Sequence, residues 1–213
     1  MSVYMRVLIT AGPTREFIDD IRFITNMSSG IMGLALAKEA VIREHDVTLV
    51  IGPTFLAPIY GVAVIPVVSS DEMTDRTLEE LSKGYDLLVS AAAIGDYTPV
   101  RKVNGKIRSA MEMTIRLKPT RKLIREARNR YPKLKIVAFK AEYDKTPKEL
   151  VAAARCLMPY ADLVVANDVS RDVFGSEETE AYIVGDEVEH IGRTSKTKAA
   201  SRIFDFIESN LLG

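Results

Sequence analysis

The sequence predicts an α/β fold with a Rossmann-like, mostly parallel sheet flanked by helices. Short β-branched runs alternate with helical segments along most of the 213 residues, the pattern of parallel strands joined by helices. The turn signal Gly185-Asp186 lies between two alternating runs and predicts a hairpin. We therefore expect antiparallel additions near residues 112–117 and 180–191, within a single domain spanning residues 1–213.

The elements follow in order from local signals. Val7–Thr10 is a short buried-type strand closed by Ala11-Gly12-Pro13, and a polar loop continues to Ser29. The other expected strands lie at 47–51, 62–67, 87–90, 113–117, 136–139, 163–166, 181–184 and 187–191. The expected helices lie at 30–43, 69–82, 120–130, from 146 onward and at 195–211. The stretch 96–109 has no periodicity, so we expect a loop there.

Three of these helices begin at a capping signal. Ser69 with Glu72 has the spacing of a capping box. Thr146-Pro147-Lys148-Glu149 combines a cap, a proline at the first helical position and a capping glutamate. Thr120 is expected to cap the basic helix that ends near Arg130.

Composition excludes several classes of protein. Lys plus Arg equals Asp plus Glu at 29 each, so no overall charge attracts nucleic acid or an anionic membrane. No run of about 18 apolar residues is present, which argues against a membrane span. The N-terminus lacks the basic region and apolar core of a signal peptide, so we expect a cytoplasmic protein.

Cysteine and histidine offer little for catalysis or metal binding. The single cysteine, Cys156, excludes an intramolecular disulfide and a Cys-rich zinc site. It falls in an apolar helical segment, so we expect an inert buried thiol. His45 and His190 are far apart in sequence and give weak support to a His-based metal site or a catalytic triad.

The segment from Asn26 to Gly33 is the first candidate site. Ser28-Ser29-Gly30 at a helix start would offer N–H groups, hydroxyls and the positive end of the helix dipole to a phosphate. A serine N-cap, with glycines for close helix packing, explains the same residues equally well. The length of the preceding loop favours a functional site, because loops above about 12–15 residues in compact domains usually have a function.

A nicotinamide site of the Rossmann type is the alternative. Its fingerprint requires closely spaced glycines after the first strand and an acidic residue after the second. Here Gly12 is followed by Pro13, and the second strand ends in Gly52-Pro53. The fingerprint is absent, so an NAD(P)-dependent reductase ranks behind other nucleotide-binding functions.

Two further candidates follow the fourth strand. The small residues at 91–95 would let a flat ring approach, and Asp96 could accept from a ribose or substrate hydroxyl or touch a metal. A tight turn with a solvated aspartate explains Asp96 equally well. Lys106-Ile107-Arg108 could present two cations to a polyphosphate, although a solvated basic loop is the simpler interpretation.

The later strands end in residues with more than one interpretation. Asn167-Asp168 follows a strand and could form Asx turns. Phe139 is either a core residue or a surface on which a base stacks. Lys140 and Glu142 could be an ordinary surface pair.

Taken together, these segments resemble the phosphopantothenoylcysteine synthetase family, also called phosphopantothenate–cysteine ligase. The family's Gly-Pro-Thr-Arg-Glu-x-Ile-Asp and Asn-x-Ser-Ser-Gly-x-Met-Gly blocks are similar to Gly12–Gly33. Ala-Ala-x-x-Asp-Tyr is similar to 92–97, Lys-Ile-Lys to 106–108, and Ala-Asn-Asp-Val to 166–169. The order of motifs is kept across nearly the whole chain, and the block around Ser28 is the most specific of them.

The resemblance implies a two-step reaction. The carboxylate of 4′-phosphopantothenate attacks the α-phosphate of CTP, which is expected over ATP, giving an acyl-cytidylate and pyrophosphate. The amine of L-cysteine then displaces CMP. Mg²⁺ is expected to bridge nucleotide phosphates, with no metal site made of protein ligands.

The resemblance also assigns roles to residues. Asn26 would hold the intermediate, and Lys106 would close over the triphosphate. The implied nucleotide-binding set is Ser28, Ser29, Gly30, Gly52, Ala92, Ala93, Asp96, Lys106, Arg108, Phe139 and Arg155. The implied substrate-binding set is Arg22, Asn26, Ala92, Ala93 and Asp96. Family members are homodimers, in which Arg22 would reach the substrate phosphate of the neighbouring subunit.

The chain departs from the family pattern in three places. Lys106-Ile107-Arg108 replaces Lys-Ile-Lys, and Lys118-Pro119-Thr120-Arg121 replaces an Asn-Pro-Asp motif. The family's basic helix corresponds to 152–159, where Arg155 could replace one lysine but Pro159 cannot supply a second charge. The flavin-dependent decarboxylase that precedes this domain in many relatives is expected on a separate partner chain.

Overall fold

The structure is a computed structural model that describes residues 4–57, 59–109, 112–170 and 175–211. The strands are β1 (Arg6–Ala11), β2 (Arg15–Phe17), β3 (Phe23–Thr25), β4 (Asp46–Ile51), β5 (Ala63–Pro66), β6 (Leu87–Ser90), β7 (Tyr97–Pro99), β8 (Leu117–Pro119), β9 (Lys135–Glu142), β10 (Leu163–Asp168), β11 (Glu178–Val184) and β12 (Val188–Ser195). The helices are α1 (Ile31–Ile42), α2 (Ser70–Leu81), α3 (Leu123–Arg130), α4 (Pro147–Arg155) and α5 (Lys196–Leu211).

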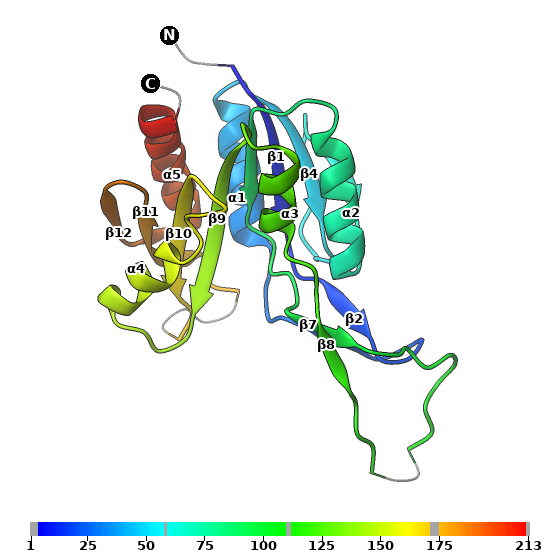
Figure 1. The fold of residues 1–213 in the computed structure, drawn as a ribbon. Helices are drawn as coiled ribbons and strands as arrows, with labels where there is room; N and C mark the ends of the chain where they lie inside the picture. The colour runs from blue at the N-terminus through cyan, green and yellow to red at the C-terminus, as the bar shows by residue number, and fades with distance from the viewer. Residues whose placement is uncertain (1–3, 58, 110–111, 171–174, 212–213) are drawn as a thin grey trace.

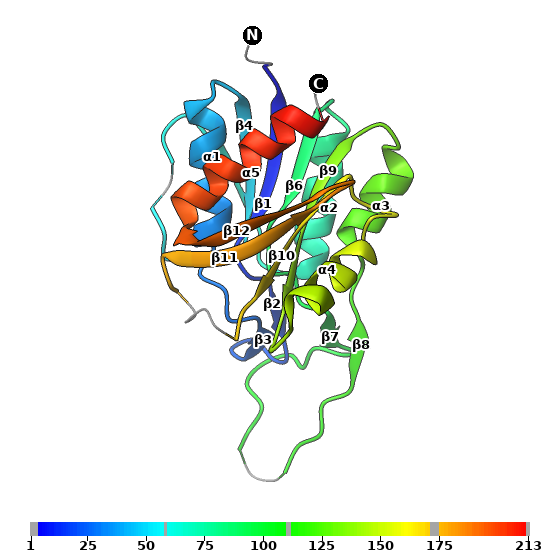
Figure 2. The same ribbon diagram turned by 90° about the vertical axis from the view of Figure 1, so that its left-hand side faces the viewer.

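The central sheet confirms the predicted α/β class. Its eight strands run in the order β12-β11-β10-β9-β6-β1-β4-β5. Every neighbouring pair from β10 to β5 is parallel, whereas β11 pairs antiparallel with both β10 and β12. The predicted hairpin near residues 180–191 is therefore present and extends the parallel sheet at one edge (Figure 2).

Helices cover both faces of this sheet (Figures 1 and 2). On one face α1 and α5 pack over the strands with a core that includes Leu36, Phe204 and Ile207. On the other face α2, α3 and α4 contribute Met73, Leu123 and other apolar side chains. Because both faces are covered, the inner strands consist of apolar runs rather than alternating ones.

The second antiparallel addition differs from the prediction. The expected strand near residues 112–117 is β8, which begins at Leu117 and pairs only with β7 in a separate two-stranded ribbon. Residues 112–114 are exposed and carry no strand assignment, because alternation without a neighbouring strand does not fix a β conformation. The ribbon and the loop joining its strands, residues 97–109 and 112–119, extend away from the sheet and are called the arm (Figure 1).

Two further local predictions were wrong. The polar loop after β1 contains the short hairpin β2–β3, whose three-residue strands are too short to show a period. Helix α3 begins at Leu123, not at Thr120, because the Thr120 hydroxyl donates to Gly95 O at 2.6 Å instead of capping the helix. The full capping box predicted at Thr146 is present. At Ser69 the predicted box is only half formed: the Ser69 hydroxyl accepts from the N–H of Glu72, but the Glu72 carboxylate accepts from the N–H of Val68 instead of that of Ser69.

No helix in the described ranges is both long enough and apolar enough to cross a bilayer.

Candidate functional site

A pocket of about 680 Å³ lies where several parallel strands end. Its walls come from the first turn of α1, the ends of β6, β9 and β10, and the start of α3. This is the edge of an open α/β sheet at which ligands usually bind. The pocket brings together eight of the residues predicted from sequence: Asn26, Ser28, Ser29, Gly30, Ala92, Ala93, Asp96 and Phe139.

The first turn of α1 has no side-chain cap. Gly30, not a serine, is the N-cap residue, with φ 79°, a left-handed conformation that glycine adopts without strain. The hydroxyls of Ser28 and Ser29 accept from the N–H groups of Gly30 and Ile31 only at 3.4 Å. The interpretation of these serines as an ordinary N-cap is therefore wrong, and the helix presents uncapped N–H groups and its positive dipole end to the pocket.

Asn26 is held by the loop that follows β6. Its Nδ2 donates to the carbonyl oxygens of Ala93 and Ile94, both at 3.3 Å. This leaves the amide oxygen as the acceptor on a side chain whose orientation is fixed from two sides. Asn26 is exposed, but it lines the pocket with its side chain oriented by these two bonds.

The loops after β1 and β6 are joined by hydrogen bonds at the base of the pocket. The N–H of Thr14 donates to Ala93 O, and the N–H of Ala93 donates to Gly12 O. The buried hydroxyl of Thr14 also accepts from the N–H of Gly95 at 2.9 Å. These bonds fix residues 92–95 against the β1 loop, and all four of these residues line the pocket.

Asp96 faces the start of α3. Its carboxylate accepts from Lys122 Nζ, and its carbonyl oxygen accepts from the N–H of Thr120. Both side chains of the ion pair are substantially exposed, at 75% for Asp96 and 45% for Lys122. An ion pair this exposed is worth little, about 0–1 kcal/mol, so a ligand can replace either partner at small cost.

The pocket wall carries a surplus of positive charge. Among the described residues that line it, one is acidic, Asp96. Five are cationic: Arg121, Lys122, Arg125, Lys140 and Lys196. A concave wall with this balance attracts an anionic ligand, even though the whole chain has no net charge.

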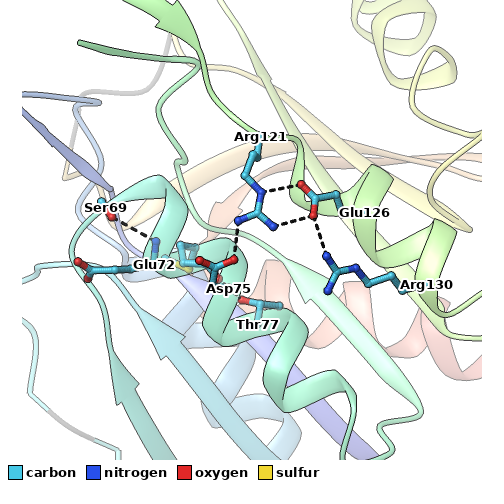
Figure 3. Close-up of polar contacts among 8 residues, drawn as sticks. Ser69, Glu72, Asp75, Thr77, Arg121, Glu126 and Arg130 are labelled. Atoms are coloured by element: carbon cyan, nitrogen blue, oxygen red, sulfur yellow. Dashed lines mark hydrogen bonds and ion pairs between the residues drawn. The ribbon is translucent and has the colours of Figure 1, made fainter. Parts of the chain in front are cut away.

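Arg121 joins α2 to the start of α3. Figure 3 shows its guanidinium between Asp75 of α2 and Glu126 of α3, with Arg130 on the far side of Glu126. The hydrogen bonds from Arg121 lower the pKa of Glu126, and those from Glu126 and Asp75 raise the pKa of Arg121. Because both carboxylates hold it, Arg121 fixes the position of the segment that carries Lys122.

Arg22, Lys106 and Arg108 do not line the pocket. Asp19, whose side chain is fully buried, accepts from Arg22 Nη1 at 2.7 Å and from the N–H of Ile107 at 3.1 Å. Arg22 Nη1 also donates to Ile107 O. Asp19 therefore connects Arg22 with the part of the arm that carries both basic residues.

The pKa of Asp19 reflects these contacts. Burial is the largest influence and acts to raise it. The backbone N–H groups of Arg22, Ile21 and Ile107 and the charge of Arg22 act in the opposite direction, and together they lower the pKa to about 2. The carboxylate is thus ionised at neutral pH.

Other predicted residues lie elsewhere. Gly52 lines a separate apolar cavity, and a Cβ there would be 1.9 Å from Pro13 O, so this glycine is needed for close backbone packing. Arg155 is exposed at the end of α4 and does not line the pocket. The prediction of a buried thiol was wrong: Cys156 is exposed, because the buried face of α4 is formed by Leu150 and Ala154.

The pair after β10 has divided roles. Asp168 is buried and accepts from the N–H groups of Asp144, Lys145 and Ser170, as expected of a structural turn former. Asn167 instead lines the pocket. Lys140 does pair with Glu142, at 3.0 Å, but it also lines the pocket.

The family described as DNA/pantothenate metabolism flavoprotein, C-terminal domain, matches residues 3–211. The chain belongs to this family. It is 42% identical over 210 residues to the coenzyme A biosynthesis bifunctional protein CoaBC of Thermococcus kodakarensis, covering 97% of this chain and 51% of that protein. The protein of the same name from Methanocaldococcus jannaschii is 40% identical over 206 residues, covering 95% and 50%. The chain therefore spans about half the length of these relatives.

Solved structures of the family have the same fold. The C-terminal domain of a CoaBC protein superposes with a TM-score of 0.80 at 30% identity, covering 97% of this chain and 95% of that domain. The DNA/pantothenate metabolism flavoprotein from Streptococcus pneumoniae gives a TM-score of 0.84 at 24% identity, with 96% and 99% covered, and at that identity supports the fold alone.

Sequence reasoning missed several pocket residues of this family member. Thr120, Lys122 and Arg125 line the pocket from the start of α3, but in the sequence they belong to an ordinary basic helix. They reach the pocket because β8, which precedes them, pairs with β7, the strand that follows Asp96. That pairing is not visible without the structure, because β7 and β8 have three residues each.

Proposed function

We propose that this chain is a phosphopantothenate–cysteine ligase that joins 4′-phosphopantothenate to L-cysteine at the expense of CTP. The observation that carries the proposal is the pocket in which the uncapped start of α1, the oriented Asn26 and five cationic side chains come together. The two relatives described above, of which this chain spans about half the length, are named coenzyme A biosynthesis bifunctional proteins. Their names support the same activity. The absent dinucleotide fingerprint disfavours the reductase alternative.

The first step activates the carboxylate of the substrate. A carboxylate oxygen attacks the α-phosphorus of CTP, the bond to the bridging oxygen breaks, and pyrophosphate leaves. The N–H groups at the start of α1 and the hydroxyls of Ser28 and Ser29 would bind phosphate oxygens there. Phe139 and the small residues Ala92 and Ala93 would bound the nucleotide, and Asp96 would accept from a hydroxyl.

The second step forms the amide. The amine of cysteine attacks the acyl carbon, CMP leaves with the electrons of the carbon–oxygen bond, and the amine loses a proton. The Asn26 side chain would hold the acyl-cytidylate through its amide oxygen, since its nitrogen is engaged with Ala93 and Ile94. This chemistry depends on positioning and charge neutralisation rather than on a protein nucleophile.

Mg²⁺ fits this site as an ion carried by the nucleotide. Among the described residues no group of three or more His, Cys, Asp or Glu side chains is placed to hold a metal ion, and Asp96 is the one carboxylate on the pocket wall. A donor set of this kind suits an ion held mainly by phosphate oxygens and water. When bound, it offsets negative charge on the phosphates.

The proposed enzyme acts as a homodimer. Arg22, Lys106 and Arg108 are gathered on or beside the arm, outside the pocket of their own chain. We propose that Arg22 contacts the substrate phosphate in the neighbouring subunit and that Lys106 and Arg108 close over the triphosphate. Sedimentation of the purified chain tests this assembly, and a monomer at all concentrations would refute it.

Pyrophosphate release tests the activity. We expect release only when both phosphopantothenate and a nucleoside triphosphate are present, with CTP the most effective of the four and ATP second to it. Amide formation should further require cysteine. Pyrophosphate release in the absence of phosphopantothenate would refute the ligase. Oxidation or reduction of a nicotinamide cofactor, followed by its absorbance, in place of pyrophosphate release would also refute it.

Asn26→Asp separates the two steps. A carboxylate at this position would set an oxygen against the carbonyl oxygens of Ala93 and Ile94, at the present 3.3 Å. Losing both bonds at a positioned site costs about 1–3 kcal/mol, or roughly 5- to 150-fold. We expect pyrophosphate release with little amide product; normal turnover would remove Asn26 from the mechanism.

A further inference from the structure

We infer that Lys122 and Arg125 bind the pyrophosphate portion of the nucleoside triphosphate and so select a triphosphate over a monophosphate. This inference rests on the proposed function. It concerns the two cations at the start of α3, one helical turn apart, that sequence reasoning did not single out as binding residues.

The five pocket cations differ in how firmly they are held. Arg121 is fixed by Asp75 and Glu126, as Figure 3 shows. Lys140 pairs with Glu142 at 3.0 Å, and Lys196 Nζ donates to Ser176 O at 2.6 Å. These three side chains already have partners close to the wall from which they extend.

Arg125 is different. Its side chain is exposed, and its guanidinium lies over the ring of Tyr160, 4.8 Å from the centroid. Within the described parts of the chain it forms no ion pair with a carboxylate. Stacking on an aromatic ring orients a guanidinium but leaves its N–H donors in the plane available to a phosphate.

Lys122 has an ion-pair partner, but one that a ligand can displace. Its partner Asp96 is 75% exposed, so the ion pair can be broken at small cost. Arg121, the residue before Lys122, is anchored to α2 and keeps the Lys122 backbone in place. A phosphate entering the pocket would therefore find Lys122 close to its working position.

The two anion-binding walls of the pocket suit different parts of the nucleotide. Gly30, the N-cap of α1, is four residues from Asn26, so a phosphate bound there is the one beside the reacting centre. The α3 wall carries full charges instead of N–H groups, and full charges are what a departing pyrophosphate needs as its negative charge grows. We therefore assign the reacting phosphate to α1 and the leaving group to α3.

Binding measurements test this assignment. The affinities of CTP, CMP and inorganic pyrophosphate would be measured by calorimetry on the full chain and on Lys122→Gln and Arg125→Gln. We expect each variant to weaken CTP and pyrophosphate by roughly tenfold or more, the usual effect of losing one charge-assisted contact, while CMP affinity changes less than twofold. Arg125→Lys should lie between the wild type and Arg125→Gln, since it keeps the charge and loses the planar fork.

The control is Lys133→Gln. It removes the same charge from an exposed residue just beyond α3 that does not line the pocket. Thermal unfolding of every variant shows whether it remains folded. If Arg125→Gln does not fold, the binding measurements on Lys122→Gln still test the inference. Variants that bind CTP and pyrophosphate as the control does would overturn the inference and leave the ligase proposal standing. Failure of the wild type to bind any nucleoside triphosphate or to release pyrophosphate would refute both.

Discussion

Gly33 lies where α1 closely approaches β1, and replacing it with alanine should move the end of the helix to which we assign phosphate binding. A Cβ built on Gly33 would lie 2.4 Å from the Cβ of Ala11 and 3.1 Å from its Cα. Carbon atoms in contact are usually about 3.5–4.0 Å apart, so the helix and β1 would have to separate by roughly 1–1.5 Å. Ala11 offers no rotamer that could relieve the contact.

The magnitude follows from two opposing effects. Overpacking of this kind costs about 1–3 kcal/mol, and removing a glycine from a helix interior returns about 0.5–1 kcal/mol. We expect a net loss of about 1–2 kcal/mol, which in a chain of this size lowers Tm by roughly 2–8 °C. The displacement should also reduce pyrophosphate release on the order of 100-fold, because a misplacement of about 1 Å near a reacting centre has effects of that size.

The assay pairs thermal unfolding with pyrophosphate release and uses Gly192→Ala as its control. Gly192 lies in β12, and a Cβ there would meet no atom within 4 Å. This variant should keep its Tm and its activity. If Gly33→Ala matched Gly192→Ala in both measurements, the close approach of α1 to β1 would not position the site.

Three other predictions concern the arm and the surface of the fold. Lys106→Gln should lose most pyrophosphate release while its Tm stays unchanged, because the side chain is exposed; full activity would make it a solvated loop residue. The pKa of Asp19 is lowered to about 2, so its ionised form stabilises the contacts with Arg22 at neutral pH and loses them as pH falls from about 4 to about 2. Asp19→Asn should therefore lower the protection of the residue 107 amide against hydrogen exchange at pH 7, because the N–H loses a charged acceptor, and unchanged protection would exclude the carboxylate as the link. Thr146→Ala should cost about 1 kcal/mol in urea unfolding by removing the cap bonds to Glu149, and an unchanged midpoint would show that the capping box contributes nothing.

The sequence predicts the central sheet well because burial on both faces leaves long apolar runs. Val7–Thr10 and Leu163–Ala166 lie inside β1 and β10, close to their expected bounds. The capping residues at Ser69 and Thr146 mark the starts of α2 and α4 because their signal is local. What fails is structure that depends on distant pairing: β2–β3 and β7–β8 have three-residue strands, too short for any period to appear.

The site divides in the same way. Asn26 through Gly30 and the small residues after β6 are recognisable from their place at strand ends, and the structure brings them into one pocket. Lys122 and Asp96 are 26 positions apart in sequence and meet only because β7 pairs with β8. Composition likewise shows no net charge, whereas the pocket wall carries an excess of cations that only the structure reveals.

The degree to which each cation is held suggests how a site without a protein nucleophile would work. Arg121 and Arg22 are fixed by carboxylates before any ligand arrives, so the segments that carry them need no rearrangement on binding. Lys122 pairs with Asp96 and would exchange this partner for a phosphate, so this cation is not left unpaired before a ligand binds. Rigid supports behind exchangeable cations would meet the two requirements of the proposed nucleotidyl transfer to a carboxylate: geometry set in advance, and charge that remains available to the leaving group.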